Sequence, residues 1–110
     1  MNLSIDVVEI AEGSVVNLVG EIDAYTAPNL KNALLPLTKK ENNLVQVDME
    51  QVSYMDSTGL GVFVNVLKSS KEHGSKLQLV NLQERVFRLF KITGLHEIMD
   101  INAVIRGGKG

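Results

Sequence analysis

The chain opens with two short runs in which apolar and polar side chains alternate. Residues 3–7 form the first run and residues 15–20 the second, and the turn-forming stretch Ala-Glu-Gly-Ser at residues 11–14 separates them. A period of two is typical of β-strands, so the pattern predicts a β-hairpin. The phase of the first run slips at Val7 and Val8, which indicates a β-bulge at that point.

Beyond Ala24 the apolar residues recur at helical spacing. They are Ala27, Leu30, Ala33, Leu34 and Leu37. Steps of three and four residues place them on one face of a helix. Pro28 suits the first turn of that helix, where a backbone N–H has no intrahelical partner to lose. Pro36 cannot donate a backbone hydrogen bond and crowds the preceding turn, so we expect the helix to kink or end near its last turn.

Segments of strand length and helix length then alternate along the chain. Strands are predicted at residues 44–49, 76–80 and 101–105, and helices from about residue 57 to 73, at 84–91 and at 95–99. Gly74 and Gly94 suit the C-terminal caps of two helices. Strands joined through helices imply parallel pairing, so the fold class should be α/β, with a mixed β-sheet, an N-terminal hairpin and packed α-helices. We expect a single domain over residues 1–106 and a disordered tail at 107–110.

Composition narrows the function classes. The chain has 110 residues, 45% of them hydrophobic, a formal net charge of −2 and no cysteine. This balance predicts a folded domain, and without cysteine there is no disulfide, thiolate zinc site or cysteine nucleophile. No basic stripe suits nucleic acid, and no apolar run approaches the roughly 20 residues of a membrane span. We therefore expect a cytoplasmic protein with no cofactor or metal, no nucleic-acid partner and no membrane contact.

The candidate chemistry centres on residues 56–59, Asp-Ser-Thr-Gly, at the start of the second predicted helix. Free backbone N–H groups and the helix dipole favour an oxygen acceptor or an anion there. One interpretation is a helix cap, because Ser, Thr and Asp are the usual capping residues. The other is a phosphate, either on a bound ligand or attached to Ser57 itself. The glycines and lysine of a phosphate-binding loop are missing, and no Gly-x-Ser-x-Gly elbow supports a serine hydrolase.

The same helix has a second candidate feature, which emerges when its residues are placed at 100° steps around the axis. The predicted core face carries Leu60, Phe63, Val64 and Leu67. Val62 and Val66 fall on the far side. Isolated exposed valines are common on protein surfaces, but two of them close to Ser57 also suit a docking strip for a partner protein.

Charged residues outside this helix allow two interpretations each. Asp23 ends the predicted hairpin just before the first helix, where it suits a helix cap. Strand ends that precede helices gather on one rim of an α/β sheet, so Asp23 should also lie near Ser57. Arg85, Arg88 and Lys91 repeat every third residue on the third helix. They form either a solvated stripe or a surface for an acidic partner.

Several of these residues occur together in a known family. The segments are residues 20–23 (Gly-Glu-Ile-Asp), 27–28 (Ala-Pro), 54–63 (Tyr-Met-Asp-Ser-Thr-Gly-Leu-Gly-Val-Phe), 88–90 (Arg-Leu-Phe) and 93–95 (Thr-Gly-Leu). In this order, spanning nearly the whole chain, they resemble the STAS-domain anti-sigma factor antagonists, and most of all the anti-sigma-B factor antagonists. The resemblance implies a STAS fold and a regulator of transcription that is not an enzyme.

The resemblance further implies a partner-switching cycle. The unmodified protein binds an anti-sigma factor that is also a serine kinase, and a sigma factor is thereby released to join RNA polymerase. The kinase supplies the ATP site and phosphorylates Ser57, the complex separates, and a serine phosphatase restores the binding form. Taking the residue patterns and the resemblance together, we predict that the partner-binding residues are Asp23, Asp56, Ser57, Thr58, Gly59, Val62 and Val66. Two alternatives stay open: a STAS scaffold module of a signalling assembly, and a nucleotide- or phosphate-binding domain.

Overall fold

The computed structural model of the chain describes residues 2–103. Its elements, in chain order, are β1 (Leu3–Glu9), β2 (Gly13–Ile22), α1 (Ala27–Thr38), β3 (Leu44–Met55), α2 (Ser57–His73), β4 (Lys76–Val80), α3 (Glu84–Thr93), the 3-10 helix η1 (Leu95–Glu97) and β5 (Asp100–Asn102). The disordered tail predicted at residues 107–110 and the end of the last predicted strand lie outside the described residues.

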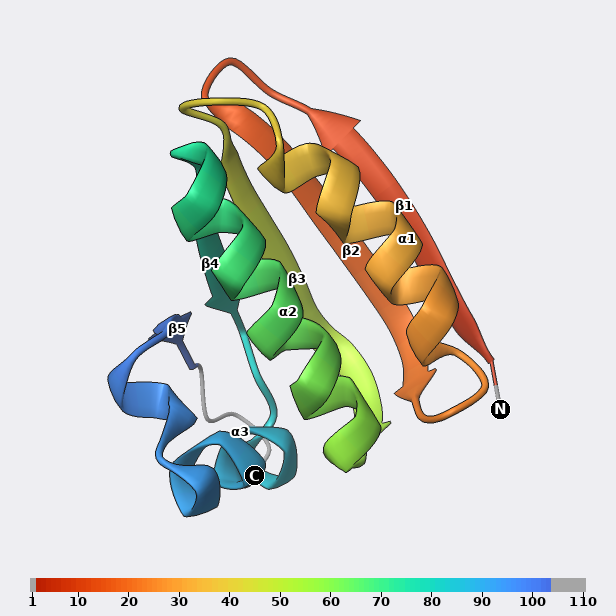
Figure 1. Cartoon of the computed structure of the whole chain (residues 1–110). Helices are drawn as coiled ribbons and strands as arrows, with labels where there is room; N and C mark the ends of the chain where they lie inside the picture. Colours follow the sequence, from red (N-terminus) through yellow and green to blue (C-terminus); the bar gives the residue numbers. More distant parts are fainter. Residues whose placement is uncertain (1, 104–110) are drawn as a thin grey trace.

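The strands form one mixed sheet in the order β1-β2-β3-β4-β5. β1 pairs antiparallel with β2, and the remaining neighbours pair in parallel. α1 and α2 lie side by side over one face of the sheet, and α3 lies beside the lower end of α2 (Figure 1). The predicted α/β class, mixed sheet and N-terminal hairpin are therefore confirmed.

The N-terminal hairpin is regular. Its two strands pair without a break from Leu3 to Glu9, so the bulge predicted at Val7 and Val8 is wrong. Both valines are exposed, at 39% and 44%. β1 is an edge strand of the sheet, where an apolar side chain need not mark the buried face. A slip in the apolar pattern there did not correspond to a slip in the pairing.

β3 is longer than predicted and continues to Met55 instead of stopping at residue 49. β4 ends opposite Asp48, so beyond that residue β3 pairs only with β2. The segment that precedes α3 meets the other edge, where Gln83 donates a hydrogen bond from Nε2 to the Glu50 carbonyl (2.8 Å). This contact fixes the start of α3 beside the second half of β3.

The predicted caps at Gly74 and Gly94 are confirmed, whereas α3 continues two residues beyond the predicted end at residue 91, and the helix predicted at 95–99 is the shorter 3-10 helix η1. α1 ends at Thr38, shortly after Pro36. α2 and α3 are closed by Gly74 and Gly94, with φ of 70° and 78°. This left-handed conformation favours glycine because a side chain would crowd the backbone.

The core lies between the sheet and the helices. Phe63 of α2 and Phe90 of α3 are among its largest buried side chains, and their ring centroids are 6.1 Å apart. The pair packs the second half of α3 against the first half of α2. Among residues 2–103, no helix is long and apolar enough to cross a membrane.

Candidate functional site

The candidate site lies where the parallel strands β2 and β3 end together. Ile22 and Met55 are paired at the ends of the two strands, and the backbone N–H of Asp56 donates to the Ile22 carbonyl (3.2 Å). The residues that follow, Asp23 on one chain segment and Ser57 on the other, therefore start from adjacent points on this edge. The predicted neighbourhood of the two segments is confirmed.

The N-terminus of α2 is capped by Asp56. This residue has extended backbone angles (φ −109°, ψ −171°), and its carboxylate accepts a hydrogen bond from the Thr58 backbone N–H (2.9 Å). Ser57 is the first helical residue and is exposed. Within residues 2–103, its hydroxyl makes no side-chain hydrogen bond. The capping role thus belongs to Asp56, and the Ser57 hydroxyl is open to solvent and to a reaction partner.

This division of roles predicts unequal effects of two alanine substitutions. Asp56→Ala should lower the free energy of unfolding by about 0.5–2 kcal/mol, because it removes the acceptor for the first turn of α2. Ser57→Ala should change it by less than about 0.5 kcal/mol, because the side chain is exposed. Urea unfolding of the two variants beside the parent measures both values. Equal losses would assign the cap to Ser57 as well.

Gly59 supports the site from inside. A Cβ atom there would lie 2.5 Å from Met55 Cγ and 2.8 Å from Ile22 Cγ2, so only glycine lets α2 start this close to the two strand ends. Gly59 is buried. From the sequence, Gly59 is predicted to be one of the partner-binding residues. Because Gly59 is buried, its role is instead to let α2 pack on the strand ends and so to hold Ser57 in place.

Asp23 orders the turn that leads into α1. Its carboxylate accepts hydrogen bonds from the backbone N–H groups of Tyr25 (2.9 Å) and Thr26 (3.1 Å). Asp23 is only 9% exposed, and Thr26 occupies the N-cap position of α1. The residue therefore caps the turn before α1, and the prediction that it caps α1 itself is wrong. The turn presents Tyr25, which is 86% exposed and which no periodic pattern of apolar residues singles out.

The predicted docking strip on α2 is wrong. Val62 and Val66 are 6% and 0% exposed, whereas Val64, predicted to be core, is 40% exposed. The reason is that α2 packs against α1 as well as against the sheet. Its buried arc is consequently rotated toward α1, and Val62 and Val66 lie inside that arc.

Comparison with known protein families matches residues 4–106 to the STAS domain. The chain belongs to the STAS domain family. It is 49% identical over 108 residues to the anti-sigma-B factor antagonist of Bacillus subtilis, with 98% of each chain covered. It is 49% identical over 105 residues to the anti-sigma-B factor antagonist of Listeria monocytogenes, with 94% of this chain and 92% of that protein covered.

Solved structures share the fold of this STAS domain. The Bacillus cell fate determinant SpoIIAA in its phosphorylated form has a TM-score of 0.72 at 17% identity, with 96% of each chain covered. The unphosphorylated anti-sigma factor antagonist SpoIIAA has a TM-score of 0.71 at 15% identity, with 96% of this chain and 94% of that chain covered. The mixed sheet and the helices over it are therefore the architecture of the family.

A groove between α1 and α2 opens beside the candidate site of this STAS domain. It is lined by Ala24, Ala27, Pro28, Lys31, Asn32, Thr58, Gly61, Val62 and Asn65. Thr58, directly after Ser57, connects the groove to the exposed hydroxyl. Sequence periodicity did not reveal it, because it requires α1 and α2 to be placed against each other.

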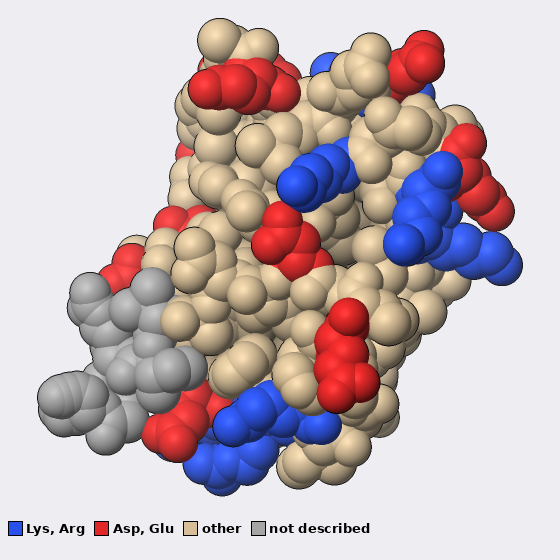
Figure 2. Space-filling view, turned by 90° about the vertical axis from the view of Figure 1, so that its left-hand side faces the viewer, with Lys and Arg blue, Asp and Glu red and all other residues tan. Residues whose placement is uncertain are grey.

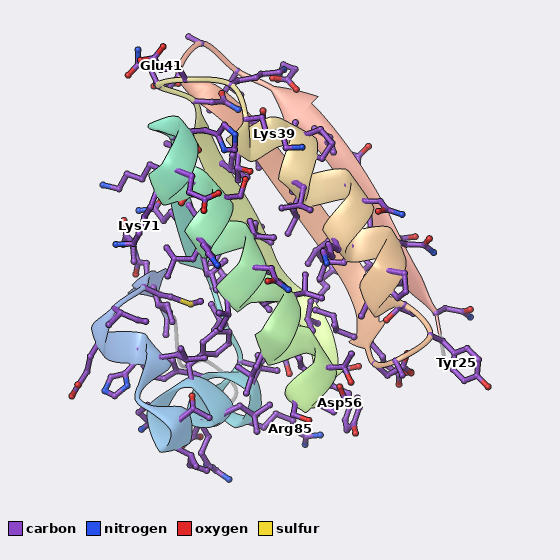
Figure 3. All side chains as sticks on the ribbon, in the orientation of Figure 1. Tyr25, Lys39, Glu41, Asp56, Lys71 and Arg85 are labelled. Carbon is purple, nitrogen blue, oxygen red and sulfur yellow. The ribbon has the colours of Figure 1, made fainter. Side chains whose placement is uncertain are left out.

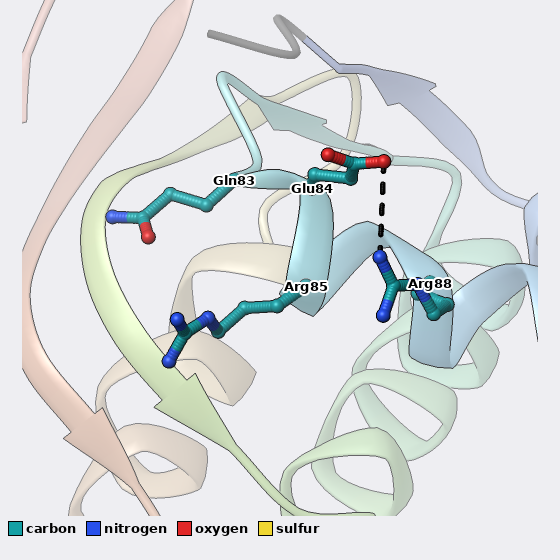
Figure 4. A pocket seen from close by; sticks show the side chains of 4 residues that line it. All are labelled: Gln83, Glu84, Arg85 and Arg88. Atoms are coloured by element: carbon teal, nitrogen blue, oxygen red, sulfur yellow. Dashed lines mark ion pairs between the residues drawn. The ribbon is translucent and has the colours of Figure 1, made fainter. Parts of the chain in front are cut away.

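The three basic residues that were predicted to form a stripe on α3 lie in three different environments. Arg88 pairs with Glu84 (3.7 Å), as Figure 4 shows, and Lys91 Nζ lies 5.3 Å from the centroid of the Phe87 ring. Arg85 is exposed and has no ion pair among residues 2–103. It lies at the same end of the domain as Asp56 (Figure 3).

Charges of both signs are scattered over the side of the STAS domain that carries β5 and α3, between larger areas without charged residues (Figure 2). Figure 2 shows acidic and basic side chains interspersed over this face. Mixed charges give a weak long-range field.

Proposed function

We propose that this chain is an anti-sigma factor antagonist that works by partner switching on Ser57. In the unphosphorylated form it binds an anti-sigma factor that is also a serine kinase, and the sigma factor is released. Phosphorylation of Ser57 breaks the complex, and a serine phosphatase restores it. The protein acts by binding and not by catalysis, and the cycle operates in the cytoplasm.

One observation carries this proposal: Ser57 is exposed, and its hydroxyl makes no side-chain hydrogen bond within residues 2–103, at a helix N-terminus that Asp56 already caps. A kinase needs an accessible hydroxyl, and the Asp56 cap leaves it accessible. The relatives from Bacillus subtilis and Listeria monocytogenes, each 49% identical, bear the name anti-sigma-B factor antagonist, which supports the assignment of the partner class.

The physical effect of a phosphate at Ser57 explains the release. Phosphorylation adds roughly −1.5 to −2 charges, while the formal net charge of the chain is −2. The helix dipole stabilises an anion at this position by only about 0.3–1 kcal/mol. Removing the phosphate from water at an interface costs more than that. The modified protein should therefore stay folded and bind poorly.

The decisive test is phosphorylation by the cognate anti-sigma factor in the presence of ATP. Ser57→Ala should abolish incorporation of phosphate. It should leave binding to the anti-sigma factor intact, because the exposed hydroxyl does not stabilise the fold. Mass spectrometry locates the modified residue, and Thr58→Ala and Ser53→Ala serve as matched controls that should still be labelled. Phosphate found mainly on Thr58 or Ser53 would overturn the assignment.

A further inference from the structure

The two glycines near the start of α2 have different reasons to be glycine. At Gly59, a Cβ atom would overlap Met55 and Ile22. At Gly61, a Cβ atom would meet nothing within 4 Å. Gly61 is exposed and lies inside a regular helix without a positive φ. A glycine weakens a helix relative to alanine, and no contact within residues 2–103 explains that cost at residue 61.

Gly61 lies in the groove between α1 and α2, on a stripe of α2 that faces α1. The stripe consists of Thr58, Gly61, Val62 and Asn65. Steps of three and four residues put these positions on one side of the helix. Without a side chain at residue 61, the backbone of α2 is accessible in the middle of the stripe. Glycine is the residue that permits such a close approach by another molecule.

The groove has a mixed chemistry. Its apolar lining comes from Ala24, Ala27, Pro28 and Val62, and its polar lining from Lys31, Asn32, Thr58 and Asn65. Lys31 is half-buried and forms no ion pair among residues 2–103. A lysine at the groove without an ion-pair partner favours an acidic group on whatever fills the groove.

We infer that the groove receives an apolar segment of the anti-sigma factor that carries one acidic side chain. The segment contacts the backbone of α2 at Gly61, and its carboxylate pairs with Lys31. This inference rests on the proposed function, because Thr58 makes the groove continuous with the Ser57 site. Gly61 is then a specificity-determining position, since any side chain there occupies space that the partner needs.

The test adds a side chain at residue 61 and measures binding of the unphosphorylated protein to the anti-sigma factor. Gly61→Leu should weaken binding at least tenfold, and Gly61→Ala should weaken it less. Neither variant should unfold at a lower temperature than the parent, because a Cβ atom at residue 61 has no neighbours. Lys71→Leu is the matched control: it places the same leucine in the last turn of α2, outside the groove, and should bind as the parent does.

Lys31 provides an independent arm of the same test. Lys31→Glu should weaken binding more than Lys31→Gln, because the reversed charge would face the carboxylate of the partner. Equal effects of the two substitutions would mean that the partner presents no acidic side chain to Lys31.

The outcomes separate the groove from the proposed function. If the parent binds the anti-sigma factor and is phosphorylated on Ser57 while Gly61→Leu binds equally well, the groove is not the docking site and the proposed function stands. If the parent does not bind the anti-sigma factor at all, the proposed function fails first. If Gly61→Leu melts well below the parent, residue 61 has a structural role and the inference is overturned.

Discussion

Ser57→Asp should weaken binding to the anti-sigma factor by roughly tenfold to a thousandfold, or about 1.4–4 kcal/mol. The substitution puts a permanent negative charge at the first position of α2, where the parent presents a neutral, exposed hydroxyl. A partner that covers this position must strip water from the new charge, and only the helix dipole compensates. Aspartate carries one charge and phosphate nearly two, so Ser57→Asp should be milder than the phosphate itself.

The measurement is titration of the anti-sigma factor with each variant, and two controls isolate the cause. Ser57→Ala removes the hydroxyl without adding charge and should bind as the parent does. Ser4→Asp adds the same charge at an exposed position of β1, on the hairpin, and should also bind normally. If Ser4→Asp weakens binding as much as Ser57→Asp, net charge and not the site is responsible.

The effect of phosphorylation should be local. Asp56 and Gly59 hold the start of α2 on the strand ends through a cap and through close packing, and a group attached to the exposed Ser57 hydroxyl disturbs neither. Amide hydrogen exchange of the phosphorylated protein should therefore change only near residue 57. Loss of protection throughout the sheet would instead indicate a conformational switch.

Local sequence signals predicted the parts of the fold that depend on them. The ends of α2 and α3 follow from Gly74 and Gly94, whose left-handed conformation is a property of the residue itself. The convergence of Asp23 and Ser57 on one edge follows from the rule that parallel strands end together. The motif at residues 56–59 is also a local signal, because the first positions of helices favour Asp, Ser and Thr.

Features that depend on neighbouring elements were missed. β3 extends past Asp48 although Glu50 and Gln51 interrupt its apolar run, because β2 on one edge and Gln83 on the other satisfy its backbone there. The groove at Gly61 exists only because α1 stands beside α2. A helix wheel gives the relative angles of side chains, but it does not say which neighbours surround the helix, and this is why Val64 and Val66 were placed on the wrong sides.

Because Val62 and Val66 are buried, substitutions at these two positions should have a large effect on stability. Replacing both Val62 and Val66 with serine should lower the free energy of unfolding by about 3–5 kcal/mol, because each change leaves a cavity and buries a hydroxyl. A domain of this size is stable by only about 5–15 kcal/mol, so the double variant should melt far below the parent. Val64→Ser, on the exposed side of the same helix, should cost less than about 1 kcal/mol.

Thermal and urea unfolding of the three proteins decide between core and surface for this pair. A double variant as stable as the parent would return Val62 and Val66 to the surface and restore the docking strip. The folded fraction of a Val66→Ser single variant should still be phosphorylated on Ser57, because Val66 is buried and does not line the groove beside that residue. Loss of phosphorylation in molecules that remain folded would mean that the packing of α2 on α1 also shapes the kinase contact.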